Sequence, residues 1–197
     1  MAAMTDTLDH VLAQAWGRLQ AGVRDRHDPW HQGVLANAGD DGPQARYVVL
    51  RAADPATGTL AFHTDRRSPK FASLGADPRL AWVFFGHGEQ LRLAGQVTLH
   101  HDDAAADAAW AAMRPLARRT YAVPLAPGTA VPAPEDAGLP GLQSPPEPAA
   151  LEAARANFVL ARVRATALDW LSLAASGHRR ARFERDGEAW RGTWLAP

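Results

Sequence analysis

The 197-residue sequence contains no cysteine. Disulfide bonds, thiolate catalysis, zinc fingers and cysteine-ligated iron–sulfur clusters are therefore excluded. Lysine is almost absent too: the sequence has one lysine, Lys70, and twenty arginines. Such a distribution also arises by chance, yet it directs attention to the residues around this one ammonium group.

Neither sign of charge is in excess, since 21 basic side chains balance 21 acidic ones. Proteins that bind nucleic acids or membrane surfaces normally carry a basic excess, so we expect no nucleic-acid partner and no membrane partner. No apolar run approaches the roughly 20 residues that span a bilayer. Residues 1–7 lack the charged and apolar regions of a signal peptide. A cytoplasmic protein is the resulting expectation.

The remaining composition is that of an ordinary globular protein, with 47% hydrophobic and 21% charged residues. The length suits one domain over residues 1–197, large enough to bury a core. Residues 124–150 differ, because they hold eight prolines with glycines between them. We expect this stretch to form a long surface loop, partly extended.

Short apolar or alternating runs at regular spacing predict antiparallel strands with few helices between them. The first three strands are expected to form a meander, and the whole set a closed antiparallel barrel. The fold class is therefore mainly β with peripheral helices (α+β). The expected strands cover residues 34–38, 46–52, 59–64, 80–85, 90–99, 158–173, 178–185 and 189–195.

Three helices and a helical turn at residues 151–155 are expected around these strands. Thr5 or Asp6 can cap the first, whose apolar residues recur at helical spacing over residues 8–19. A short helix follows over residues 71–74, and the acidic residues 102–103 begin a third, alanine-rich helix. The run His-His-Asp-Asp at residues 100–103 contains metal-ligand types, but a strand end followed by a capped helix is favoured, so no metal site is expected.

Residues 63–70 (His-Thr-Asp-Arg-Arg-Ser-Pro-Lys) join a predicted strand to the short helix. Ser68 can cap that helix with its hydroxyl, and Pro69 fits the first helical position. Free N–H groups at a helix start carry partial positive charge, to which Arg66, Arg67 and Lys70 add full charges. The motif therefore predicts a phosphate cradle. A capped surface helix with solvated charges explains the same residues equally well.

Several separated motifs resemble the pyridoxamine 5'-phosphate oxidase family in order and spacing. They lie at residues 46–51, 62–70, 77–79 and 90–95, with a further similarity over residues 182–197. The resemblance implies an FMN-binding split β-barrel with Greek-key-like connections. It also implies a homodimer with FMN at the interface between the subunits.

The resemblance assigns cofactor contacts to individual positions. Arg46 and Lys70 would bind the FMN phosphate with Thr64 and Ser68, and Arg182 would come from the second subunit. Gln90 would reach the flavin from a neighbouring strand. The full cofactor-binding set expected is Arg46, Val48, Val49, Leu50, Arg51, His63, Thr64, Arg67, Ser68, Lys70, Gln90 and Arg182.

The expected substrate contacts are Arg51, His178 and Arg180. Family members that oxidise pyridoxamine phosphate carry an Arg-x-His-x-Arg pattern, and here residues 178–182 read His-Arg-Arg-Ala-Arg. The family usually has an arginine directly before the lysine of the phosphate cradle, whereas this chain has Pro69 there. Arg118, Arg119 and Tyr121 are candidates for the central substrate segment, with no secure alignment. FMN binding is thus better supported than a vitamin B6 substrate.

The resemblance implies an FMN-dependent oxidoreductase in which a small substrate passes a hydride to flavin N5. No catalytic side chain is then expected, because the cofactor carries the chemistry and the protein binds, orients and tunes it. Two alternatives stay open: a reductase that uses FMN or a deazaflavin on another substrate, and a flavin-binding or sensor protein without turnover.

Overall fold

A computed structural model describes residues 7–138 and 148–197. Its helices and strands are α1 (Leu8–Arg24), η1 (Pro29–His31), β1 (Gln32–Gly39), β2 (Gly42–Val49), β3 (Ala52–Asp54), β4 (Thr59–Asp65), α2 (Pro69–Ala76), β5 (Arg79–Gly86), β6 (Glu89–His100), α3 (Ala104–Ala112), α4 (Pro115–Arg118), η2 (Arg119–Tyr121), η3 (Pro134–Ala137), α5 (Pro148–Arg155), β7 (Phe158–Ser172), β8 (Arg179–Asp186) and β9 (Ala189–Leu195). In the described part of the chain, no helix is long and apolar enough to cross a bilayer.

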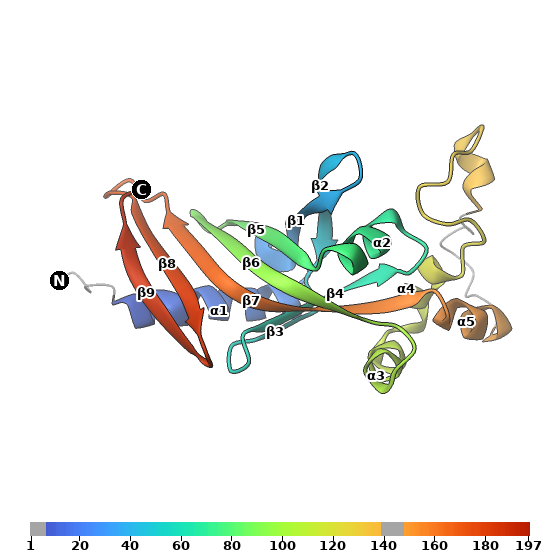
Figure 1. Cartoon of the computed structure of the whole chain (residues 1–197), viewed down its shortest axis with the longest axis horizontal. Helices are drawn as coiled ribbons and strands as arrows, with labels where there is room; N and C mark the ends of the chain where they lie inside the picture. Colours follow the sequence, from blue (N-terminus) through green and yellow to red (C-terminus); the bar gives the residue numbers. More distant parts are fainter. Residues whose placement is uncertain (1–6, 139–147) are drawn as a thin grey trace.

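The strands form one antiparallel sheet in the order β2-β1-β5-β6-β7-β4-β3, and β8 and β9 extend it from β7. The two long strands β6 and β7 run through its middle, with a register shift at Ala94/Gly95. Figure 1 shows α2, α4 and α5 at one end of this sheet and the β8–β9 hairpin at the other. The expected fold class, a mainly β split barrel with peripheral helices, is confirmed.

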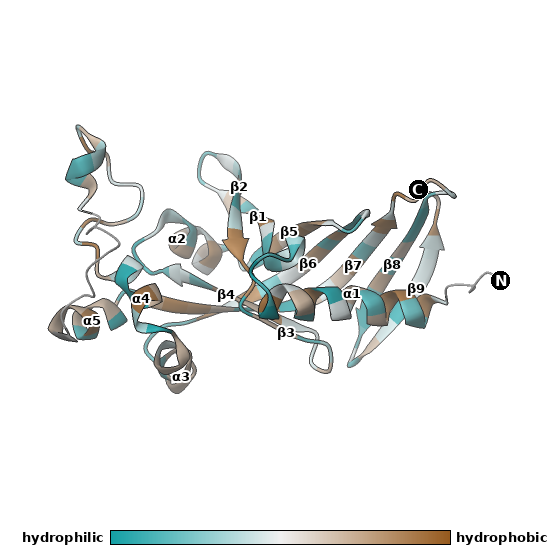
Figure 2. Ribbon diagram, turned by 180° about the vertical axis from the view of Figure 1, so that it is seen from behind, coloured by the Kyte–Doolittle hydropathy of each residue, from teal (hydrophilic) through white to brown (hydrophobic). Residues whose placement is uncertain are grey.

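Alternation along β6 buries Leu91 and Leu93, while Arg92 between them is exposed. The buried face meets Trp82, Phe84 and other large side chains in the main core. Helix α1 covers this face with Val11, Trp16 and Leu19, and Figure 2 shows it lying across the sheet. The β5–β6 turn uses positive φ at both His87 and Gly88, which suits a two-residue hairpin.

The prediction of one buried strand over residues 46–52, within a three-strand meander, was wrong. Strand β2 ends at Val49, and β3 begins only at Ala52. The chain turns between them because Leu50 donates its N–H to the carbonyl of His31, whereas the next N–H, of Arg51, donates to Ala61. Strand β4 therefore pairs with β3 and β7, not with β2.

The helix caps differ in part from the prediction. Thr7 caps α1, with its side-chain oxygen accepting the N–H of His10 at 3.2 Å, whereas the predicted caps Thr5 and Asp6 lie outside the described residues. Asp103 caps α3 as expected and accepts the N–H of Ala106. The expected loop over residues 124–150 contains η3 and the start of α5, and residues 139–147 lie outside the described part.

Candidate functional site

Lys70, in the first turn of α2, reaches back to the end of β4. Its Nζ lies 3.0 Å from Thr64 Oγ1 and 3.4 Å from Ser68 Oγ. Both hydroxyl residues are buried, and Pro69 occupies the first helical position as expected. Ser68 does not cap the helix with its side chain, contrary to prediction, because its hydroxyl donates to the carbonyl of Asp65 at 2.7 Å.

Arg46, on β2, brings a second cation to the same place. Its guanidinium donates to Asn37 Oδ1, and Asn37 is held in turn by its amide nitrogen, 3.0 Å from Ser73 Oγ on α2. Burial and then the nearby charge of Arg46 lower the pKa of Lys70. Within residues 7–138 and 148–197, neither cation forms an ion pair with a carboxylate. Two cations and two hydroxyls that form no ion pair with a carboxylate in the described residues fit a phosphate group.

Arg46, Thr64 and Lys70 line a cleft of about 340 Å³. Seven of the twelve expected cofactor residues are at its wall, which they share with Tyr47, Asp65, Thr120, Tyr121 and Pro127. The seven are Arg46, Val48, Val49, Arg51, His63, Thr64 and Lys70. The part of the sequence that resembles a flavin site thus folds into one cleft, at the junction of β2, β4 and α2.

Two expected contacts are directed elsewhere. Leu50 is fully buried in the main core, so its side chain does not face the cleft. Arg67 forms a fork with the buried Asp65, with nitrogen–oxygen distances of 3.0 and 2.8 Å, and also donates to the carbonyl oxygens of Val123 and Pro124. Its donors are therefore occupied, and the structure gives no support to a phosphate contact by Arg67.

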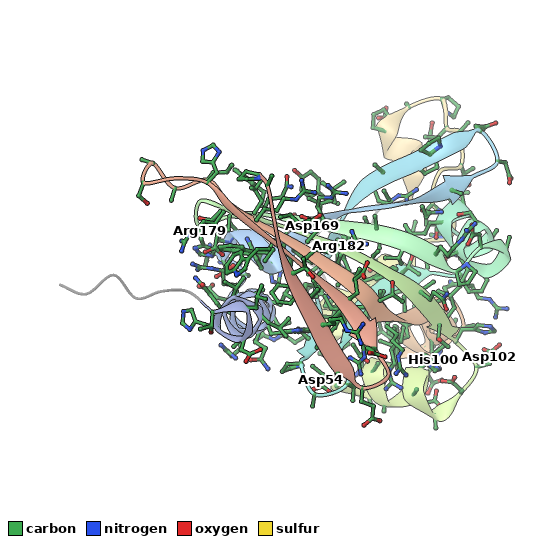
Figure 3. All side chains as sticks on the ribbon, turned by 60° about the vertical axis from the view of Figure 1, so that its left-hand side comes forward. Asp54, His100, Asp102, Asp169, Arg179 and Arg182 are labelled. Carbon is green, nitrogen blue, oxygen red and sulfur yellow. The ribbon has the colours of Figure 1, made fainter. Side chains whose placement is uncertain are left out.

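Gln90, which is expected to reach the flavin from a neighbouring strand, lies far along the sheet from this cleft within one chain. Gln90 pairs with Leu171 near the end of β7, whereas Thr64 pairs with Val159 at its start. Arg182 pairs with Asp169, near the same end of β7. Figure 3 shows these two residues beside each other. Within one chain, both Gln90 and Arg182 therefore lie away from the cleft.

The expected substrate residues are divided in the same way. Arg51 lines the cleft, whereas His178 is exposed just before β8 and Arg180 lies on β8. The guanidinium of Arg180 forms a fork with the buried Asp169, at 3.0 and 2.8 Å. Hydrogen bonding to Asp169 raises the pKa of Arg180. This cation is already neutralised by a carboxylate that the sequence analysis did not single out.

A second, larger cleft of about 940 Å³ adjoins the first, and the two share Arg51 and His63. One wall is an alanine face of α3, and the opposite walls carry arginines with one acidic residue, Asp25. The sequence analysis missed this cleft, although alanines at helical spacing over residues 105–112 were the signal for its flat wall. The basic side chains at its wall are Arg24, Arg26, His27, His31, Arg51, His63, Arg114 and Arg162.

Of the unaligned candidates, Arg118 is structural. Its guanidinium lies 5.2 Å from the ring centroid of Trp110 and donates to the carbonyls of Ala111 and Met113. Arg119 is buried, and Tyr121 lines the smaller cleft. Burial raises the pKa of the Tyr121 phenol, so this hydroxyl stays protonated at neutral pH.

His63 stands between the two clefts, with its ring 4.9 Å from that of Phe158. Burial, and then the positive charge of Arg51, lower the pKa of His63 to about 4 from an ordinary 6.5. The imidazole is therefore neutral at physiological pH. A neutral ring offers one donor and one acceptor without adding to the positive charge of the clefts.

Residues 28–137, more than half of the chain, match the sequence model of the family described as pyridoxamine 5'-phosphate oxidase. A pyridoxine/pyridoxamine 5'-phosphate oxidase from Kineococcus radiotolerans is 34% identical over 108 residues. The alignment covers 54% of this chain and 46% of that protein, so the chain spans less than half the length of this curated relative.

Two solved structures share the fold over most of the chain. A pyridoxamine 5'-phosphate oxidase-related, FMN-binding protein from Nostoc punctiforme is 25% identical, with a TM-score of 0.74 over 93% of this chain and 96% of that one. PhzG from Burkholderia lata, solved with tetrahydrophenazine-1-carboxylic acid, is 21% identical, with a TM-score of 0.69 over 98% and 95%. The second likeness shows the fold alone.

We predict that His63 makes stability fall as the solution becomes acidic. Between pH 6.5 and about 4 the unfolded chain binds a proton at this histidine and the folded chain does not, so stability rises with pH across this window. The wild type should lose about 2 kcal/mol more than His63→Phe between pH 6.5 and 4.5. Urea unfolding at both pH values measures this difference, and identical pH profiles would disprove it.

Proposed function

Because the chain belongs to the pyridoxamine 5'-phosphate oxidase family, we propose that it is an FMN-dependent oxidoreductase. The observation that carries the proposal is the desolvated pair Arg46 and Lys70, in which Lys70 contacts the hydroxyls of Thr64 and Ser68 and neither cation forms an ion pair with a carboxylate in the described residues. A flavin phosphate supplies the missing negative charge. When bound, FMN would provide the redox chemistry by accepting a hydride at N5.

The chain's own residues would bind and orient the cofactor. The phosphate cradle, which consists of Arg46, Lys70, Thr64 and Ser68, would hold the phosphate. Val48 and Val49 give the smaller cleft an apolar wall. Arg51 and His63 stand where this cleft opens into the larger one. Because five arginines and one carboxylate line the larger cleft, we propose it as the pocket for a small, flat substrate that carries negative charge.

We further propose that the active form is a homodimer. Tyr47 is 72% exposed and Phe85 63% exposed, and with Val34 and Val83 they form an apolar face on β2, β1 and β5. This face lines one side of a cleft whose other lining residues include Arg26, Asp28, His31 and Gln32. An exposed apolar face of this kind is typical of a protein interface. Tyr47 also lines the proposed flavin cleft, so a second copy docked here would bring its own side chains to that site.

A flavin-binding or sensor protein without turnover is the alternative. The observation that favours it is the Asp169–Arg180 pair, since it neutralises a cation expected to orient substrate. This alternative would be supported if FMN-loaded protein kept its yellow flavin absorption after mixing with every reducing substrate tested.

We predict that Lys70→Ala weakens FMN binding by about tenfold to a hundredfold, because a charge-assisted hydrogen bond contributes roughly 1.5–3 kcal/mol. Riboflavin lacks the phosphate, so its affinity should hardly change. Fluorescence titration of both flavins against the wild type and Lys70→Ala gives the comparison, with Lys70→Arg as the charge-preserving control. Equal losses for the two flavins would show that the cradle does not hold phosphate.

The dimer proposal predicts that Phe85→Asp produces monomers at micromolar concentration, because a charge would be buried in the interface. Obligate dimers commonly bury about 2,000 Å² or more, so the wild type should sediment as a stable dimer. Leu116→Asp is the matched control, since Leu116 is 61% exposed on α4, outside the apolar face. A monomeric wild type would refute the proposal.

We also predict that pyridoxamine 5'-phosphate is oxidised slowly or not at all by FMN-loaded protein. The chain presents His178 and an Arg180 already paired with Asp169, and a clamp misplaced by about 1 Å can cost on the order of a hundredfold in rate. Steady-state turnover with saturating oxygen is the measurement, with the double variant His178→Arg, Arg180→His for comparison. Wild-type turnover of roughly 1–10 per second would contradict the prediction.

A further inference from the structure

The chain segment over residues 120–129, here called the strap, runs beside the phosphate cradle. Thr120, Tyr121 and Pro127 belong to the wall of the smaller cleft. Farther along, the nearest atoms to a methyl group built on Gly128 are those of the Pro69 ring, at 3.9 and 4.0 Å. The strap therefore passes beside the start of α2, where the cradle lies.

The first part of the strap is fixed by packing. The Tyr121 ring meets Phe158 edge to face with centroids 5.3 Å apart, and Trp110 lies 5.8 Å away on another side. The side-chain amide of Asn157 also donates to the carbonyl of Tyr121 at 2.9 Å. These contacts anchor Tyr121 to the second core cluster around Phe158.

Beyond Tyr121, Arg67 ties the strap to the end of β4. One terminal nitrogen donates to the carbonyls of Val123 and Pro124, at 2.9 and 3.2 Å. The other nitrogens form the fork with Asp65, whose Oδ1 also accepts the Arg67 backbone N–H at 2.8 Å. Because Asp65 is buried and fixes the guanidinium from behind, the orientation of the donors toward the strap is preset.

We propose that Arg67 is a positioning residue that latches the strap against the cofactor cleft and so slows flavin dissociation. The statement about flavin rests on the function proposed above, whereas the latch itself concerns only Arg67, Asp65 and the two strap carbonyls. Arg67 acts through the strap and does not touch phosphate. Replacing Arg67 should therefore speed the dissociation of any ligand that the strap covers, whether or not the ligand has a phosphate group.

The latch is tested first in flavin-free protein, by hydrogen–deuterium exchange over the strap. Arg67→Met should raise the exchange of the strap amides by about tenfold, because a charged donor is lost from two carbonyls. Arg66→Met is the matched control, since the neighbouring arginine is 40% exposed and contacts Ala156 and Asp102 instead. If Arg67→Met folds poorly because Asp65 loses its partner, the double variant Asp65→Asn, Arg67→Met is measured in its place. Unchanged exchange in the strap would overturn the proposal.

The second measurement compares flavin dissociation rates. Arg67→Met should release FMN and riboflavin faster by the same factor, about tenfold, whereas Arg66→Met should leave the riboflavin rate unchanged. A loss for FMN alone would overturn the latch and make Arg67 a direct phosphate contact. If the wild type binds no flavin, the proposed function fails, and the exchange measurement alone then decides whether the latch exists.

Discussion

The cleft depends on holding two cations, Arg46 and Lys70, close together without a carboxylate between them. Burial and mutual repulsion lower the pKa of Lys70, so the arrangement is costly in the ligand-free chain. It persists because other elements fix each cation: Asn37 on β1 holds Arg46, and Thr64 and Ser68 hold Lys70. An anion that binds there gains from an electrostatic field that the fold has already built.

Asp65 decides whether this field stays positive. It is the acidic side chain at the wall of the smaller cleft, and its carboxylate forms a fork with Arg67. Its charge also acts on Lys70, where it partly offsets the lowering of the pKa by burial and by Arg46. The same pairing points Arg67 at the strap. One buried ion pair therefore offsets the negative charge of Asp65 beside the cradle and fixes the chain segment next to it. A similar pair, Asp169 with Arg180, neutralises a cation at the other end of the sheet.

Much of the fold follows from patterns of neighbouring residues. The alternation along β6, the turn at residues 86–88 and the helix start at Ser68 and Pro69 all appear in the structure where the sequence places them. These features depend on local backbone geometry and on a period of two along a half-buried strand, which the sequence carries directly. The break at Leu50 and Arg51 could not be predicted in this way, because its hydrogen-bond partners His31 and Ala61 lie elsewhere in the chain.

The candidate site divides along the same line. The sequence determined the residue types of the phosphate cradle and its place at a strand-to-helix junction, since residues 63–70 are contiguous. Only the tertiary structure brought Arg46 close to Lys70 and buried Leu50 in the core. It also paired Arg67 with Asp65 and the strap. Gln90, on β6, lies beside the far end of β7. The physical reason is that a guanidinium has several possible partners of similar strength. The choice among them depends on which carbonyls and carboxylates folding brings within about 3 Å, and residue spacing does not contain that distance.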